Sequence, residues 1–418
     1  MRVFKFGGAS LRNAPGIRQV AKIVGQADRP LIVVVSAMGK TTNLLEKIHA
    51  GLRACTQVES LLAECRDYHQ AIVADLFGAD DKSVADEIAS LINGFGADAK
   101  LPLPFDATYD QVVSKGEVIS SLIVFHFLSK LGLDIQWLDA RKLVATDSTF
   151  REGKVEWDET GRRINQAVRN SKAGVFITQG FIGGTEAGLT TTLGREGSDF
   201  TAAIFASALQ ATSVTIWKDV PGVMSADPKR LPDAIVFPEL PFREAAEMTY
   251  YGASVIHPKT IKPLANKGIP LFVRNFDDPE LPGTNIHECV VRHLPPLIVF
   301  KDNQVLISCK VTDYSFVNEH QMHLIFHILT ELDIRVNVMQ NSAISFSFCI
   351  DFRESKLIAL IARLQEHFEV YYNTGLTLIT VKNYDAETFE RYRRLAGVIL
   401  EQSSRSTLQI LVKAHDME

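Results

Sequence analysis

The first two-thirds of the chain alternate short apolar runs with stretches of helical periodicity. Residues 31–35 form a continuous apolar run rich in β-branched side chains, which is typical of a strand covered on both faces. Residues 14–27 place their apolar side chains at helical spacing. Further strands are predicted at residues 3–6, 135–138, 175–178, 213–217 and 270–274, and helices at 116–130 and 200–209. This alternation predicts an α/β domain whose mostly parallel sheet is sandwiched by helices.

A polar stretch with several prolines and glycines, residues 277–296, separates this region from a C-terminal part of different pattern. We expect one domain over 1–295 and a second region over 296–418. In the second region the pattern predicts a strand (305–312), a helix (319–332), two strands (336–340 and 343–352) and a helix (355–367). A shorter copy follows, with a strand (376–382), a helix (386–394) and two strands (398–402 and 407–412). Such α+β modules share one sheet or bind a small ligand at a common edge.

The segment with the most chemical information is Thr192-Leu193-Gly194-Arg195-Glu196-Gly197-Ser198-Asp199, which leads into a predicted helix. Its glycines let a ligand approach the backbone, and a helix N-terminus favours anions. Arg195 adds a planar fork for a carboxylate or a phosphate. The alternative is an ordinary capped loop in which Ser198 or Asp199 is the N-cap, but that alternative explains one polar residue and not the arginine, serine, aspartate and two glycines together.

A second polar loop, Lys5-Phe6-Gly7-Gly8-Ala9-Ser10, follows the first predicted strand. Adjacent glycines expose N–H groups to phosphate oxygens, and a lysine beside them supplies a point charge. Gly39-Lys40-Thr41-Thr42 resembles the end of a P-loop, but Val34 occupies the position of the required first glycine, which argues against a Walker-type NTPase. Ser36 and Thr42 are interpreted as hydroxyls facing the ligand, with an N-cap as the alternative for Thr42.

Further polar residues follow other predicted strands or open helices. Glu117 opens a helix, where it either compensates the helix dipole or belongs to the site. Lys218 and Asp219 end a strand and suit phosphates and either Mg²⁺ or ribose. His257, before a proline, is interpreted as structural. The polar loops after Phe6, Val35, Thr178 and Trp217 are all expected at the carboxyl edge of the sheet, where open α/β sheets bind ligands.

Composition limits the classes of function. A net charge of −5 argues against a nucleic-acid binder. The five cysteines are scattered, without metal-site spacing, and indicate reduced thiols in a cytoplasmic protein. No signal peptide and no apolar run of transmembrane length is apparent, so no membrane partner is expected, and no dedicated metal site is predicted.

Taken in order, these loops resemble the aspartate kinases of the amino-acid kinase family. The motifs are Lys-Phe-Gly-Gly-Ala-Ser, with Ala9 where threonine is usual, then Thr-Thr-Leu-Gly-Arg-Glu-Gly-Ser-Asp, Trp-Lys-Asp-Val-Pro-Gly and Val-Ile-His-Pro. The resemblance covers residues 1–290. The C-terminal third resembles, in pattern, a pair of ACT modules, which in that family bind end-product amino acids and usually pair across a dimer.

The resemblance implies phosphorylation of the side-chain carboxylate of L-aspartate by Mg-ATP, the first step of lysine, threonine and methionine biosynthesis. By motif, Lys5 stabilises the transferring phosphoryl group and Asp199 orients Lys5 or the substrate. Arg195 holds the α-carboxylate of aspartate and Glu117 its α-ammonium. The remaining implied contacts are Ser36, Thr42 and Ser198 for aspartate, and Gly7, Gly8, Ser10, Lys218, Asp219, Met224, Lys229 and Ser254 for the nucleotide.

Several positions depart from the family pattern. Ser254 stands where some members have lysine, Lys218 where they have threonine, and Met224 where a tyrosine is common. We expect Lys218 to replace the missing cation. In the regulatory region, Asn337 stands where lysine-sensitive members have an acid, and Asn318 to Gln321 replace a Ser-Arg-Gly-Phe-type turn. Asn318, Gln321 and Asn337 are candidate effector contacts, with weak or absent lysine inhibition expected and threonine the better effector candidate.

Two alternatives stay open at this point. One is a related kinase acting on glutamate, N-acetylglutamate or uridylate. The other is a catalytically weak effector-binding protein that keeps the fold for regulation. The presence of Lys5, Gly7, Gly8, Arg195 and Asp199 argues against the second alternative, whereas Ser254 slightly favours it.

Overall fold

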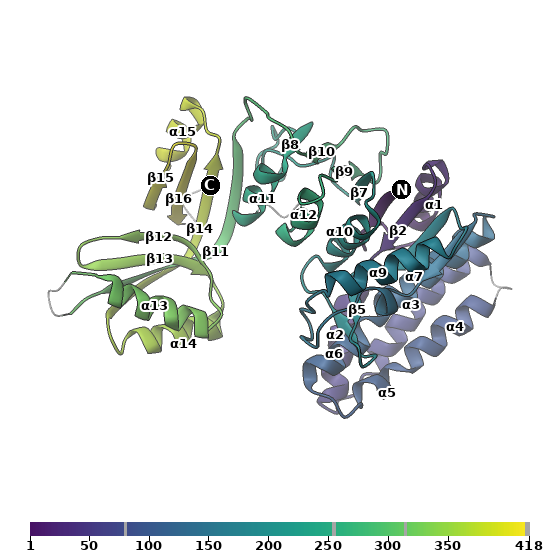
Figure 1. Ribbon diagram of the computed structural model, residues 1–418. Coiled ribbons are helices and arrows are strands. Elements are labelled where there is room, and N and C mark those ends of the chain that lie inside the picture. The colour runs from purple at the N-terminus through teal and green to yellow at the C-terminus, as the bar shows by residue number, and fades with distance from the viewer. Residues whose placement is uncertain (79–81, 253–255, 313–315, 414–418) are drawn as a thin grey trace. The chain divides into compact units, whose positions relative to one another are not determined.

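The computed structural model describes residues 1–78, 82–252, 256–312 and 316–413. The chain forms two compact units, drawn in Figure 1. The first comprises Met1–Val223, Val236–Ala246 and Ser254–Val290, and the second comprises Met224–Ile235, Glu247–Ala253 and Val291–Glu418. The units therefore do not divide the chain at one point near residue 295, because two earlier segments belong with the C-terminal part.

The first unit is built on an eight-stranded sheet. Its order is β3 (Ile135–Leu138), β4 (Val175–Gln179), β2 (Leu31–Val35), β1 (Arg2–Phe6), β7 (Ser213–Lys218), β9 (Leu271–Asn275), β10 (Thr284–His287) and β8 (Glu239–Pro241). Neighbours from β3 to β9 are parallel, and β10 is antiparallel to β9. All five residues of β2 are fully buried, which confirms the strand predicted from its apolar run.

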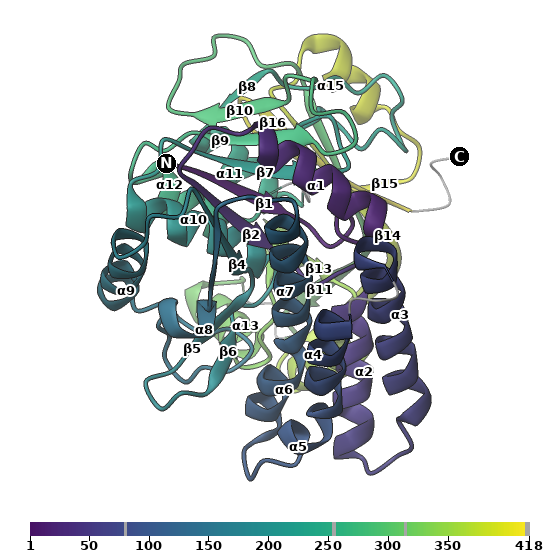
Figure 2. The same cartoon turned by 90° about the vertical axis from the view of Figure 1, so that its right-hand side faces the viewer.

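The helices of this part of the chain are α1 (Ala14–Gln26), α2 (Thr41–Arg53), α3 (Glu59–Phe77), α4 (Lys82–Asn93), α5 (Phe95–Ala99), α6 (Phe105–Val113), α7 (Lys115–Lys130), α8 (Ala140–Leu143), α9 (Trp157–Arg169), α10 (Gly197–Leu209), α11 (Phe242–Tyr250), whose last residues belong to the second unit, and α12 (Pro258–Ala265). Figure 2 shows α2, α3, α4, α6 and α7 as a bundle extending from the sheet. Helix α10 is apolar around its circumference because it packs on β1, β2 and β7 and also contacts α9 and α12.

The stretch Phe105–Lys130, which contains α6 and α7, is long and apolar enough to cross a membrane by length and composition alone. The expectation that no run reaches this length was therefore wrong. However, 72% of its most apolar window is buried inside the protein, as in the core helix of a globular domain.

The second unit contains a six-stranded antiparallel sheet. Its order is β12 (Val336–Asn341), β13 (Ser345–Asp351), β11 (Leu297–Lys310), β14 (Glu369–Lys382), β16 (Thr407–Lys413) and β15 (Val398–Ser403), with helices α13 (Glu319–Glu331), α14 (Glu354–Leu364) and α15 (Ala386–Arg393). The βαββα pattern and its copy with one helix fewer are confirmed, and both share this sheet through the β11–β14 pair.

Strands β11 and β14 begin earlier than their apolar patterns predicted. In β11 the polar run Lys301-Asp302-Asn303-Gln304 looked like a strand boundary, but the strand continues through it as a bulge. Asn303 takes a left-handed conformation there, with φ of +55°, which asparagine tolerates better than most residues. The bulge gathers several polar side chains into one place.

The segment Met224–Ile235 lies along this part of β11. The Ile298 N–H donates to the Ser225 carbonyl oxygen at 2.8 Å, and the Arg230 guanidinium forms an ion pair with Asp302. The same guanidinium lies over the Phe300 ring, 4.9 Å from its centroid. These contacts explain why the segment belongs to the second unit.

Candidate active site

The sheet order brings the predicted polar loops together. Strands β4, β2, β1 and β7 are neighbours, and their register aligns Phe6 with Val35 and Trp217, and Val35 with Gln179. Because these strands are parallel, the loops that follow them leave the same edge of the sheet. The polar residues after Phe6, Val35 and Trp217 therefore share the edge where such sheets bind ligands.

The loop after β1 is a tight turn in which the close approach of neighbouring backbone requires glycine at Gly8. The N–H groups of Ser10 and Leu11 donate to the carbonyl oxygens of Gly7 and Gly8, at 3.0 and 3.2 Å. A Cβ on Gly8 would lie 2.6 Å from the carbonyl oxygen of Ala37. A Cβ on Gly7 would lie 3.5 Å from Lys5 Nζ, so the Lys5 ammonium lies close to the glycine backbone. A cation and exposed backbone are thereby combined at one point.

Asp199 is the centre of a buried charge cluster. Its carboxylate lies 2.6 Å from Lys5 Nζ and 3.4 Å from Lys218 Nζ. Its side chain is 3% exposed, whereas those of Lys5 and Lys218 are 10% and 20% exposed. Burial alone would raise the pKa of this carboxyl, but the two ammonium groups hold the pKa of Asp199 below its usual value. The cluster carries two positive charges against one negative charge, which suits an anionic ligand.

The loop before α10 places Arg195 at the surface. Gly194 and the N-cap residue Glu196 are both left-handed, with φ of +77° and +53°, and α10 begins at Gly197. Ser198 and Asp199 therefore lie inside the first turn, and the alternative that either is the N-cap was wrong. Among the described residues, Arg195 forms no ion pair or hydrogen bond, so its guanidinium is available to an anion.

Glu117 is fully buried in the first turn of α7. The Ala37 N–H donates to its Oε1 at 3.3 Å, while its Oε2 has no hydrogen-bond partner within the described parts of the chain. Burial raises the pKa of Glu117 to about 8, although the Ala37 N–H and the Lys5 charge oppose this rise. A buried carboxyl with one unpaired oxygen is not explained by dipole compensation at a helix surface, and it suits a cationic ligand group.

Four further predicted residues of the first unit lie in loops or at the start of a helix. Thr42 is the second residue of α2, whose N-cap is Lys40, so the N-cap alternative for Thr42 was also wrong. Ser36 follows β2 directly and its N–H donates to the Phe6 carbonyl oxygen at 3.2 Å. Ser10 and Asp219 line one pocket of about 300 Å³.

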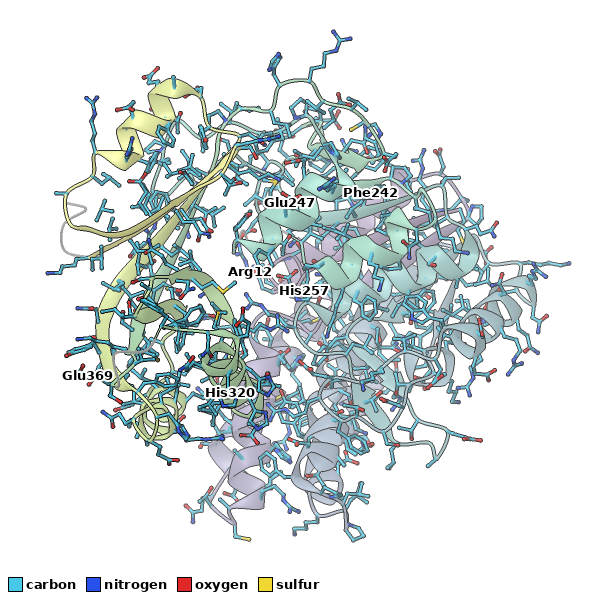
Figure 3. The ribbon with its side chains drawn as sticks, turned by 60° about the vertical axis from the view of Figure 1, so that its left-hand side comes forward. Arg12, Phe242, Glu247, His257, His320 and Glu369 are labelled. Atoms are coloured by element: carbon cyan, nitrogen blue, oxygen red, sulfur yellow. The ribbon has the colours of Figure 1, made fainter. Side chains whose placement is uncertain are left out.

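Other predicted residues are not brought to this edge by any described contact. Met224 and Lys229 belong to the second unit, where the Lys229 N–H donates to Asp227 Oδ1 at 2.9 Å. Ser254 lies outside the described residues. Asn318 and Gln321 form the capping box of α13. His257, labelled in Figure 3, accepts a hydrogen bond from the Lys259 N–H at the start of α12, in keeping with its structural interpretation.

Asp110 and Gln111 were not singled out from the sequence. Asp110 is fully buried and accepts from the Thr192 N–H at 2.9 Å, the Thr192 hydroxyl at 2.8 Å and the Arg151 N–H at 2.9 Å. Gln111 pairs through its side-chain amide with the backbone of Thr190. Both fix the strand β6 (Thr190–Thr192) that leads to Arg195. The available signal was a polar pair inside an apolar helix.

Comparisons with known proteins agree with this arrangement. The model of the amino acid kinase family matches residues 1–275. The chain is 35% identical to lysine-sensitive aspartokinase 3 of Escherichia coli, over 84% of this chain and 78% of that protein. It is 32% identical to the chloroplastic bifunctional aspartokinase/homoserine dehydrogenase 1 of Arabidopsis thaliana, of which it spans 42%.

Solved structures extend the similarity to the whole chain. E. coli aspartokinase III in complex with aspartate and ADP covers 100% of this chain, with a TM-score of 0.84 and 29% identity. The same enzyme with lysine and aspartate gives a TM-score of 0.83. The family match spans well over half of the chain, and the relatives align over both the kinase and the regulatory parts. The chain therefore belongs to the amino acid kinase family and, within it, to the aspartokinases.

Proposed function

We propose that this protein transfers the γ-phosphoryl group of ATP to the side-chain carboxylate of L-aspartate, forming 4-phospho-L-aspartate. The observation that carries the proposal is the Lys5–Asp199–Lys218 cluster at the carboxyl edge of the sheet, in a chain whose relatives are aspartokinases. The buried Lys5 ammonium and the partly buried Lys218 ammonium around one carboxylate leave net positive charge where a phosphoryl group develops negative charge.

The reaction needs no general base. The carboxyl group of free aspartate has a reference pKa of about 4, so it is already an ionised nucleophile at neutral pH. Catalysis therefore rests on neutralising phosphate charge and aligning the attacking oxygen. Lys5 stabilises the transferring group, and Asp199 holds the Lys5 ammonium in place.

Aspartate would be held by groups of matching charge. The Arg195 guanidinium, which has no partner among the described residues, takes the α-carboxylate in a bidentate arrangement. The unpaired Oε2 of Glu117 takes the α-ammonium, and the bound cation favours ionisation of this carboxyl. Hydroxyls of Ser36, Thr42 and Ser198 complete the set.

The nucleotide would occupy the glycine loop and its neighbours. The N–H groups of Gly7 and Gly8 face the phosphates, assisted by Lys218, and Ser10 and Asp219 share a pocket beside them. Mg²⁺ enters as part of Mg-ATP, coordinated by the phosphates. Met224, Lys229 and Ser254 are assigned to the nucleotide by motif.

A hydroxamate assay tests the activity directly, because hydroxylamine traps an acyl phosphate. We expect product only with Mg-ATP and L-aspartate together. Product with glutamate or N-acetylglutamate instead would indicate a related kinase, while ADP formation with uridylate would indicate a nucleotide kinase. No product with any acceptor would indicate an effector-binding protein. Lys5→Met serves as the control without the phosphoryl-stabilising cation.

The second unit is proposed to bind an amino-acid effector and to pair with a second copy. Lys301 Nζ lies 2.8 Å from both Asn337 Oδ1 and Asp351 Oδ1. The ammonium of a lysine effector would therefore meet the like-charged Lys301 ammonium beside Asn337, where lysine-sensitive members have an acid. This repulsion supports weak lysine inhibition. Titrations of activity with lysine and with threonine test this, and lysine inhibition in the micromolar range would contradict it. Size-exclusion chromatography with light scattering tests the dimer.

A further inference from the structure

Three potential metal ligands meet at the outer edge of the first unit's sheet. Glu239 on β8, and His287 and Cys289 at and after the end of β10, place their ligand atoms within 4.8 Å of one another. Figure 1 shows β8 beside β10, away from the strands that carry the phosphotransfer loops. None of these three residues has a role in the proposed reaction.

The strand pattern explains how they meet. Leu240 and Ile286 are 1% and 0% exposed, so they face the core, and their neighbours Glu239 and His287 point the opposite way. The parallel register aligns Glu239 with Asn285 and Pro241 with His287. Glu239 Oε2 lies 3.2 Å from His287 Nε2. Cys289 follows His287 by two residues, after a bend at Glu288, and its Sγ lies within 4.8 Å of the other two ligand atoms.

We propose that Glu239, His287 and Cys289 bind a divalent transition-metal ion of the zinc type, with a fourth position open to water. A thiolate, an imidazole and a carboxylate are the three ligand classes that zinc takes in proteins. Magnesium and calcium prefer oxygen-only sites, so this set selects against the ion that accompanies ATP.

The distances fit such an ion after small side-chain rotations. Zinc–ligand bonds of about 2.0–2.3 Å in a tetrahedron place ligand atoms roughly 3.3–3.8 Å apart. The three ligand atoms now lie within 4.8 Å of one another, so each pair must approach by at most about 1–1.5 Å. The side chains of His287 and Glu239 are 30% and 52% exposed, so both can rotate and an ion can enter from solvent.

Coordination also involves a proton. A metal ion takes a cysteine ligand as the thiolate, so binding displaces the thiol proton of Cys289 to solvent. The bound ion would tie the edge strand β8 to the chain after β10 and stabilise the folded state by linkage.

The test uses full-length protein without a histidine tag, stripped with chelator and kept reduced. Titration with Co²⁺ should give a thiolate-to-cobalt charge-transfer band that saturates near one equivalent per chain, and Zn²⁺ should abolish it. Cys289→Ser should remove the band. His287→Gln should weaken metal binding by at least about tenfold, because replacing even a residue that only hydrogen-bonds to a metal ligand lowers metal affinity by that factor.

Cys55→Ser is the matched control, because Cys55 is an exposed free thiol that is not part of the cluster. It should leave the band unchanged. All three variants should keep wild-type unfolding temperatures without metal and wild-type kinase activity with Mg-ATP, which shows that they fold. A band that persists in Cys289→Ser, or absence of saturable Co²⁺ and Zn²⁺ binding by wild type, would overturn the proposal.

Discussion

Replacing Asp199 with asparagine tests the central charge cluster. The amide has the shape of the carboxylate but no charge, so the ammonium groups of Lys5 and Lys218, now 2.6 and 3.4 Å from the carboxylate oxygens, lose their counter-charge. At an effective dielectric of about 20, each contact is worth roughly 5–6 kcal/mol of Coulomb energy before desolvation is subtracted. Breaking a buried pair by removing one partner costs about 3–5 kcal/mol in practice.

We expect two measurable consequences of Asp199→Asn. The free energy of unfolding should fall by about 3 kcal/mol without ligand, and Mg-ATP should restore part of it because phosphates replace the missing negative charge. Turnover should fall about 10²–10³-fold, the usual effect of losing one element of electrostatic preorganisation, because Lys5 is no longer held in place. The KM for aspartate should change much less.

Coupled hydroxamate kinetics and urea unfolding, each with and without Mg-ATP, measure these quantities. Lys5→Met is the companion variant. Because the two residues act as a unit, the double variant should be hardly less active than Lys5→Met alone. A normal kcat for Asp199→Asn would refute the reasoning, because it would mean that Lys5 needs no partner in the transition state.

Three further predictions follow from the site. Glu117 has a pKa raised to about 8 in the folded protein, against 4.5 in the unfolded chain, so the folded state binds more protons between these pH values. The free energy of unfolding should therefore fall as pH rises from 4.5 to about 8. In urea unfolding, Glu117→Gln should abolish this pH dependence, and it should raise the KM for aspartate about ten- to hundredfold. Arg195→Ala should raise the same KM while leaving the unfolding midpoint unchanged, because Arg195 has no partner among the described residues; a shifted midpoint would contradict this. Lys218→Ala should raise the KM for ATP and lower kcat, and unchanged values of both would exclude a role for Lys218 at the phosphates.

The parts of the fold that sequence patterns predicted are those with local causes. The buried strand Leu31–Val35, the glycine turn after Phe6 and the glycine-bearing loop before α10 each follow from side chains within a few residues. The alternation of strands and helices predicts parallel strands whose loops leave one edge, while the order β4, β2, β1, β7 is known only from the structure.

What escaped prediction depends on contacts between distant residues. Asp110 bonds to Thr192, 82 positions later, and Glu239 meets His287, 48 positions later. No local pattern indicates such pairs. The β11 bulge was not predicted for a related reason. The polar run from Lys301 to Gln304 has the composition of a loop, and only the partners of its side chains show that it is part of a strand.

The attachment of Met224–Ile235 to β11 has a thermodynamic consequence. Gln304 is buried in the β11 bulge, where the Asn337 side-chain amide donates to its Oε1, and its own amide donates to the Asp302 carbonyl oxygen. Asp302 in turn holds Arg230, the neighbour of Lys229. If Lys229 binds the nucleotide as proposed, strand β11 couples nucleotide binding to the binding of any ligand that rearranges Asn337. Each must then change the affinity of the other by the same factor.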